Sequence, residues 1–186
     1  MPESYPREHI EDLVDDNLEW NQLHNMMSDF KDADRFQKVR DILQDRVDWD
    51  DPIIIPYADH LYVVAKSETR WVIKCDCGHE FCEHDENWKT DALINVRDSE
   101  EEYLEIYPED MHPHPEYMEL REFFCPGCKT LLEVTNVMPG YPLIHEFEPD
   151  IETFYDDWID EPIPARGEPQ ADCPSGAGID SSIHSS

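Results

Sequence analysis

Two cysteine motifs, Cys75-Asp-Cys77-Gly78 and Cys125-Pro-Gly-Cys128, decide how this chain folds. The first follows the apolar run Trp71-Val-Ile and the second precedes Leu131-Leu132, so we expect both motifs at the ends of strands. Two thiolates on one tight turn can converge on a metal ion, and tetrahedral zinc requires four ligands at about 2.3 Å. The motifs therefore predict one zinc site built from two turns.

The second motif supplies two ligands, and the first cysteine cluster must supply two more. Within that cluster we prefer Cys75 and Cys77, because they end a predicted strand and because Gly78 gives the backbone freedom that such a turn needs. The alternatives in the same cluster are Cys82, His79 and His84. The predicted metal ligands are Cys75, Cys77, Cys125 and Cys128.

Other interpretations of the cysteines fit less well. In a reducing cytosol, clustered cysteines favour metal over disulfides or ordinary buried thiols. A thioredoxin-like redox pair would open a helix, whereas Leu131–Val134 has the pattern of a strand. Four thiolates could also hold iron, as in rubredoxin, but a cytosolic site supplied by two hairpins favours zinc. A four-cysteine site has no open coordination position, so we expect it to stabilise the fold and not to catalyse.

Lys129 is unusual at its position in the second motif. The backbone after the second cysteine often needs a positive φ, and glycine is the usual residue there. We expect Lys129 to cost about 1 kcal/mol. Zinc binding, of order 10 kcal/mol, exceeds this cost.

The charge of the chain is extreme. In 186 residues there are 45 Asp and Glu against 14 Lys and Arg, a formal net charge of −31. Because about 1 M salt shortens the Debye length to about 3 Å and screens such self-repulsion, we expect a halophilic source. An acidic mesophilic protein that binds a basic partner is the alternative. Nucleic acid is not an expected partner, since phosphate binding depends on Lys and Arg and the chain shows no basic patch.

The sequence gives no sign of a membrane protein. No apolar run approaches the roughly 20 residues that a membrane span needs. Residues 1–8 carry charge where a signal peptide needs an apolar stretch. We therefore expect a cytoplasmic protein with no membrane association.

The hydrophobic pattern divides the chain into three parts. Residues 1–51 have a helical pattern that predicts three short helices. Residues 52–161 contain the predicted strands and end in an amphipathic helix. Residues 162–186 are rich in Pro, Gly, Ser and Asp and are expected to be disordered. The predicted fold class is α+β, with short N-terminal helices, a β-rich zinc-ribbon-like lobe and a C-terminal helix.

Finer features follow from local signals. Asp32 or Asp34 is expected to cap the third helix. The segment Pro115–Phe124 is expected to be either a short helix or an extended arm leading into the second motif. The remaining predicted elements are strands over Ile53–Ile55, Leu61–Ala65, Trp71–Ile73, Ala92–Val96 and Leu131–Val134, an acidic helix over Asp98–Ile106, and the terminal helix over Ile151–Ile159.

No group of residues forms a complete active site. His112 and His114 are flanked by prolines, which favours a surface loop over a second metal site or an acid/base pair. The pair His145-Glu146 lacks the second histidine of the zinc-protease motif. Phosphate loops, nucleophile elbows and dinucleotide fingerprints are also missing. We therefore predict no catalytic and no cofactor-binding residues in this chain.

Several stretches resemble the acetone carboxylase gamma subunit family, over roughly Ile10 to Asp160. Related small zinc subunits serve acetophenone carboxylase and hydantoinase-like enzymes. This chain departs from the family at Lys129, in its acidity and in a Ser-rich tail after Ala165, none of which touches the proposed ligands. The stretches are Trp49-Asp-Asp-Pro-Ile-Ile-Ile-Pro56, Trp71-Val-Ile-Lys-Cys75-Asp-Cys77-Gly-His79-Glu-Phe-Cys82, Asn87-Trp88-Lys89, Arg121-Glu-Phe-Phe-Cys125-Pro-Gly-Cys128-Lys-Thr-Leu-Leu-Glu133-Val, and Tyr141-Pro-Leu-Ile-His145-Glu-Phe-Glu-Pro-Asp150-Ile-Glu-Thr-Phe-Tyr155.

The resemblance implies a heterohexamer with two copies each of alpha, beta and gamma subunits, which carboxylates acetone to acetoacetate with bicarbonate and ATP. Phosphorylation and a catalytic Mn²⁺ would belong to the larger alpha and beta subunits. This chain would be a non-catalytic subunit of that ligase, stapled by Zn²⁺, with its N-terminal helices and the aromatic segment Tyr141–Trp158 packed on its partners. A free-standing zinc-ribbon adaptor and a rubredoxin-like electron carrier are the rival classes.

Overall fold

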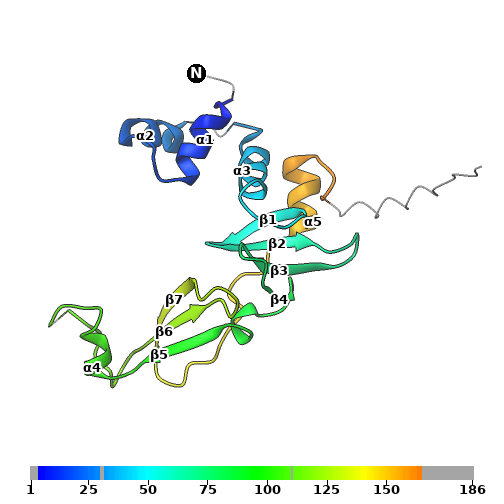
Figure 1. Cartoon of the computed structure of the whole chain (residues 1–186). Helices are drawn as coiled ribbons and strands as arrows, with labels where there is room; N and C mark the ends of the chain where they lie inside the picture. Colours follow the sequence, from blue (N-terminus) through cyan, green and yellow to red (C-terminus); the bar gives the residue numbers. More distant parts are fainter. Residues whose placement is uncertain (1–3, 30–31, 110, 165–186) are drawn as a thin grey trace, which may run out of the picture.

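Three short helices open the chain, as predicted. The computed structural model describes residues 4–29, 32–109 and 111–164. The helices are α1 (Arg7–Val14), α2 (Trp20–Ser28) and α3 (Arg35–Gln44), and they gather at one end of the molecule (Figure 1). Their apolar faces meet around the buried side chains of Ile10, Met26 and Ile42. The helical periodicity of the N-terminal segment therefore buries a small core of its own.

The predicted side-chain cap of α3 is wrong. Asp34 occupies the N-cap position, but its backbone is not extended and its carboxylate bonds no helix amide. It accepts a hydrogen bond from Ser4 at 2.9 Å and pairs with Lys38 at 2.8 Å. Asp32 instead pairs with Arg35 at 2.5 Å. Lys38 and Arg35 thus pair with the two carboxylates that were expected to cap the first amides of α3.

The first sheet is antiparallel, in the order β1-β2-β3-β4. Its strands are β1 (Ile53–Ala58), β2 (Leu61–Ala65), β3 (Trp71–Cys75) and β4 (Glu80–Glu83). All five residues of β2 are buried, because both faces of the sheet are covered. One face packs against the C-terminal helix through Ile151 and Tyr155, and the other packs against Leu43, Val47 and Trp49.

The second sheet is antiparallel, in the order β5-β6-β7. Its strands are β5 (Leu93–Arg97), β6 (Glu119–Phe124) and β7 (Leu131–Val137). The segment leading into the second cysteine motif is therefore extended, and the alternative of a short helix there is wrong for β6. A single-turn helix, α4 (Glu100–Tyr103), follows β5 and is capped by the hydroxyl of Ser99. It is shorter than the predicted acidic helix.

A mixed core joins the two sheets. Leu61, Ile73 and Cys75 come from the first sheet, and Phe123, Cys125 and Leu132 come from the second. Trp88, in a 3₁₀ turn η1 (Trp88–Thr90), packs between them. The two sheets thus share one apolar cluster that includes a cysteine from each motif.

An extended strap, residues 141–147, also runs from one sheet to the other. Arg121 of β6 donates to the carbonyl of Tyr141 at 2.6 Å. Lys89 pairs with Glu146 at 2.9 Å, and the hydroxyl of Tyr57 in β1 donates to the carbonyl of Phe147 at 2.6 Å. Because the strap forms no regular β-ladder, these side-chain bonds hold it against the two sheets.

The predicted C-terminal helix lies over the first sheet, beside α3 (Figure 1). It begins as α5 (Ile151–Thr153), capped by the Asp150 side chain, and continues as a π-helical stretch, η2 (Phe154–Ile159). The chain thus has the predicted α+β class with its C-terminal helix. Ile163, within the predicted tail, packs on the core cluster beneath this helix, and residues 165–186 lie outside the described part.

The described residues include no helix that is both long enough and apolar enough to cross a membrane.

Candidate metal centre

The first cysteine motif forms a tight knuckle between β3 and β4. Cys75 ends β3, and its amide donates to the carbonyl of His79 at 2.8 Å. The amide of Gly78 donates back to the carbonyl of Cys75 at 2.9 Å. Gly78 has φ +92°, which glycine adopts readily and other residues do not. This turn brings Cys75 and Cys77 onto the same side of the hairpin end.

The second motif forms a matching knuckle between β6 and β7. The amide of Cys125 donates to the carbonyl of Thr130 at 3.0 Å, and the amide of Lys129 donates to the carbonyl of Cys125 at 2.9 Å. Lys129 has φ +67°, which confirms the positive φ predicted for it. A lysine in the left-handed region carries the steric cost of its Cβ, which glycine would avoid.

The two knuckles bring four sulfurs into one group. The Sγ atoms of Cys75, Cys77, Cys125 and Cys128 all lie within 4.8 Å of one another. Across the knuckles, Cys75 and Cys128 are 3.9 Å apart and Cys77 and Cys125 are 3.7 Å apart. Four sulfurs at about 2.3 Å from a tetrahedral ion would be about 3.8 Å from each other. The donor set and its spacing thus fit zinc, although metal binding itself stays a prediction.

The knuckles approach so closely that a side chain at position 127 would be tightly packed. A Cβ placed on Gly127 would meet Cβ of His79 at 3.0 Å and the sulfur of Cys77 at 3.3 Å. Backbone of one turn therefore packs directly on side chains of the other. Sequence reasoning treated Gly127 as part of a turn and missed this contact, although the Pro-Gly pair between two cysteines was its visible signal.

The surroundings of the sulfurs differ in polarity. Burial raises the pKa of the Cys75 and Cys77 thiols, because a thiolate loses its hydration there. Burial acts in the same direction on Cys128, but hydrogen bonds with the hydroxyl and backbone of Thr130 outweigh it and bring its pKa to about 6. A cation among the sulfurs would offset the desolvation of Cys75 and Cys77 as thiolates.

The alternative ligands point elsewhere. The sulfur of Cys82 lies 3.6 Å from the carbonyl oxygen of Glu86, and burial together with nearby carboxylates raises its pKa to about 12. His79 packs edge-on against Phe81, and His84 packs edge-on against Trp71. None of the three joins the four-sulfur group. Cys173 lies outside the described residues.

The other histidines considered as chemistry have structural contacts. His112 stacks on Tyr103 with ring centroids 5.8 Å apart, and His114 lies against Tyr117. His145 lies 3.3 Å from the hydroxyl of Tyr57, within the strap. Each histidine therefore contacts an aromatic residue of the fold.

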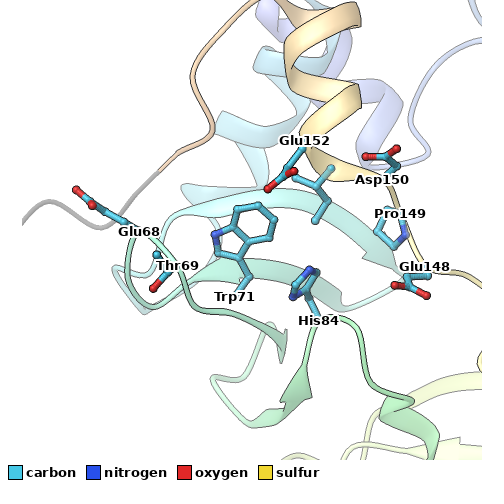
Figure 2. A pocket seen from close by; sticks show the side chains of 9 residues that line it. Glu68, Thr69, Trp71, His84, Glu148, Pro149, Asp150 and Glu152 are labelled. Carbon is cyan, nitrogen blue, oxygen red and sulfur yellow. The ribbon is translucent and has the colours of Figure 1, made fainter.

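A pocket of about 560 Å³ lies between the β2–β3 turn, the end of β4 and the segment entering α5 (Figure 2). Trp71 and His84 form its aromatic wall, with ring centroids 5.0 Å apart. The carboxylates around it repel anions such as phosphates, so its lining suits a cationic group better. These carboxylates belong to Glu68, Glu148, Asp150 and Glu152.

The fold and the four-sulfur group define a small zinc-ribbon-like protein. Comparison with known proteins narrows this class. A family model described as acetone carboxylase gamma subunit matches residues 47–159, which include both cysteine motifs. The acetone carboxylase gamma subunit of Xanthobacter autotrophicus is 45% identical over 166 residues, covering 89% of this chain and 99% of that protein.

A second relative is more distant. The acetophenone carboxylase beta subunit of Aromatoleum aromaticum is 28% identical over 80 residues, which make up 42% of this chain and 62% of that protein. The family match and the longer alignment together decide the assignment. The chain belongs to the acetone carboxylase gamma subunit family, as the sequence stretches indicated.

Proposed function

We propose that this chain is the gamma subunit of an acetone carboxylase, a structural zinc-binding subunit of the complex that carboxylates acetone to acetoacetate with bicarbonate and ATP. One observation carries the proposal: the alignment at 45% identity runs along 99% of a protein named as such a subunit. Its partners would be the alpha and beta subunits, in an assembly with two copies of each chain. The cytoplasm would be its location.

The four cysteines would serve structure and not turnover. Cys75, Cys77, Cys125 and Cys128 would hold Zn²⁺ and leave no position open for a substrate. The ion would link the β3–β4 hairpin to the β6–β7 hairpin, and its binding would contribute folding free energy. ATP and Mn²⁺ would bind to the larger subunits, where phosphorylation and carboxylation take place. The acidic lining of the pocket beside Trp71 supports placing ATP and bicarbonate on the larger subunits, because both are anions that carboxylates repel.

A related ketone is the alternative substrate. The alignment with an acetophenone carboxylase subunit favours a shared subunit class, in which hydantoinase-like enzymes would also have a counterpart. It covers 42% of this chain, against 89% for the acetone carboxylase relative, so acetone is the better proposal. A free-standing zinc-ribbon adaptor would need neither large subunit, and the alignment along a whole carboxylase subunit argues against it.

The acidity of the chain points to a salt-rich cytosol. A net charge of −31 on 186 residues creates self-repulsion that molar salt would screen. Ion pairs use many of the 14 basic residues, and Lys74 and Lys89 are both buried beside carboxylates. We propose a halophilic source on this ground.

The test is ATP hydrolysis that depends on a ketone. The chain is mixed with the two large subunits, and turnover with acetone and with acetophenone is compared with and without it. We expect no turnover from the isolated chain, a stable complex in gel filtration, and a preference for acetone. Turnover by the chain alone, or failure to enter the complex, would contradict the proposal. A preference for acetophenone would keep the proposed subunit class but would replace acetone by acetophenone as the substrate.

A further inference from the structure

The sheet β5–β7 exposes apolar side chains that the rest of the described chain does not cover. On β5, Leu93 is 44% exposed, and Ile94 and Val96 are each 39% exposed. On β7, Leu131 is 43% exposed and Val134 is 46% exposed. The first sheet differs, since its central strand is wholly buried. Exposed apolar groups gathered on one element are typical of a protein interface.

Strand register places part of this apolar surface on one face. Leu93 pairs with Phe124, and Phe124 pairs with Leu131, so the three form a row across the sheet. Val134 lies on the same face, opposite Glu122 in the neighbouring row. The row adjoins the second knuckle, because Phe124 directly precedes Cys125. The row of Leu93, Phe124 and Leu131 therefore lies next to the four-sulfur group.

The outer edge of β5 is also open. β5 is the outermost strand, it pairs with β6 without a bulge, and all its residues except Arg97 are exposed. It contains neither Pro nor Lys, which often protect such an edge, and its single charged residue, Arg97, is held in ion pairs with Glu105 and Glu122. The edge strand β1 of the first sheet contrasts with it, because β1 contains Pro56 and two irregularities in its pairing.

We infer that β5 and the apolar row beside it form the docking surface for a large carboxylase subunit, which adds a strand to the open edge of β5. The inference rests on the proposed function and names the surface that it needs. Backbone hydrogen bonds would provide the pairing, and Leu93, Phe124 and Leu131 would provide apolar contact.

Charge identifies the occupant as a different chain, not a second copy. Asp91 and Asp98 flank β5 at its two ends, and both are exposed. If two copies paired through β5, an antiparallel arrangement would place Asp91 near Asp98 at both ends, and a parallel one would place like residues together. The net charge of −31 on each copy adds to this repulsion. The fitting partner strand is apolar and flanked by Lys or Arg.

The experiment places lysines on the proposed strand. The double variant Leu93→Lys/Val96→Lys is compared with Leu104→Lys/Met111→Lys, which makes the same charge change at exposed apolar residues outside the sheets. Binding of the full chain to the two large subunits is measured by sedimentation. We expect the first variant to bind at least about tenfold more weakly than the wild type, and the control to bind within about twofold of it. Melting temperature and metal content are measured for both.

Each result decides between occupants. If the wild type and the Leu93→Lys/Val96→Lys variant bind equally well, the proposed docking surface is wrong, but the subunit assignment still stands. A wild type that does not bind the large subunits overturns both. Dimerisation of the isolated chain that the same variant abolishes identifies a second copy as the occupant and overturns the inference.

Hydrogen exchange of the wild type tests the surface without any substitution. Alternate amides of β5 point away from β6 and should exchange quickly in the isolated chain. In the complex the exchange of these alternate amides should slow at least about a hundredfold. The β5 amides that pair with β6 should be protected as well. Unchanged exchange at these alternate amides would contradict strand addition, even if the variants failed to fold.

Discussion

The two sheets of this molecule are stabilised in different ways. The first, β1–β4, is covered on both faces by helices and by the segment around Trp49. The second, β5–β7, exposes five apolar residues of its edge strands and contacts the first sheet through one core cluster, the strap and the cysteine knuckles. A sheet with its own double cover can fold on local packing. We propose that the other sheet depends on the knuckles and on a partner subunit.

Metal removal should produce the largest effect and should separate the two sheets. A strong chelator is expected to lower the free energy of unfolding of the second sheet by up to about 10 kcal/mol, because four thiolates lose their common ion. Hydrogen exchange should rise over β5–β7 first, while β2, buried along its whole length, stays protected. Equal loss of protection in both sheets would contradict this difference. Unchanged protection in β5–β7 would contradict a structural metal.

A buried lysine packs against each sheet, Lys74 within β3 and Lys89 in the turn η1 beside β7, and the pair allows a matched test. Lys74 pairs with Asp51 at 2.6 Å and lies over the ring of Trp49. Lys89 pairs with Glu133 at 2.5 Å and lies over the ring of Phe123. Replacing either lysine by Met should cost about 2 kcal/mol, because charged hydrogen bonds are lost. Exchange should rise in the first sheet for Lys74→Met and in the strap and second sheet for Lys89→Met. The same exchange pattern in both variants would show that the sheets unfold as one unit.

The Lys74 variant should also change the response to acid. Burial alone would raise the pKa of Asp51, but hydrogen bonds from Lys74 and Lys66 hold that pKa below its ordinary value. A lowered folded-state pKa gives stability that is present above about pH 4 and lost as the pH falls through the lower folded value. Denaturant midpoints should therefore differ most between wild type and Lys74→Met near neutral pH and converge in acid. A difference that grows on acidification would have the wrong sign.

Salt should act on both sheets alike, because the acidic residues are spread along the whole chain. We expect the melting temperature to rise by several degrees or more as potassium chloride is increased into the molar range, as self-repulsion is screened. Sodium and tetramethylammonium chloride serve as controls for a specific potassium effect. A flat or falling melting temperature would remove the reason for assigning a halophilic source.

The smallest effects should come from the backbone of the two knuckles. Lys129→Gly relieves a left-handed lysine and should stabilise the second knuckle by at most about 1 kcal/mol. Gly78→Ala places a Cβ at φ +92° and should destabilise the first knuckle by about 1 to 2 kcal/mol. Chemical denaturation of the two variants measures both changes. A destabilising Lys129→Gly would mean that the bond from its ammonium to the carbonyl of Pro126 outweighs the strain.

Much of the fold could be predicted because its signals are local. Three helices follow from apolar spacing, and hairpins follow from β-rich runs that end in cysteine. The positive φ of Lys129 follows from its place after a cysteine turn. The division into two sheets could not be predicted, because strand pairing over long distances leaves no trace in a single sequence. The cap of α3 failed because Asp34 found the charged partner Lys38 in place of an amide.

The candidate site likewise has features that the sequence could predict and features that it could not. The four cysteines could be chosen from spacing, and the structure places their sulfurs together. The role of Gly127 in the contact between knuckles depends on a second turn 50 residues away and was missed. The burial of Lys74 and Lys89 could not be predicted, because a buried lysine is visible only once its carboxylate partners are in place. The strap has no periodicity and was assigned no structure of its own.

The most direct test is the zinc content of single cysteine variants. Under reducing conditions the wild type should contain one zinc per chain and be colourless, since zinc has no visible absorption band. Cys75→Ala, Cys77→Ala, Cys125→Ala and Cys128→Ala should each lose the metal, and Cys82→Ala and Cys173→Ala should keep it. Loss of zinc from Cys82→Ala with retention in Cys75→Ala would contradict the four-sulfur site. A strong visible absorption band in the wild type would indicate that the site binds iron and not zinc.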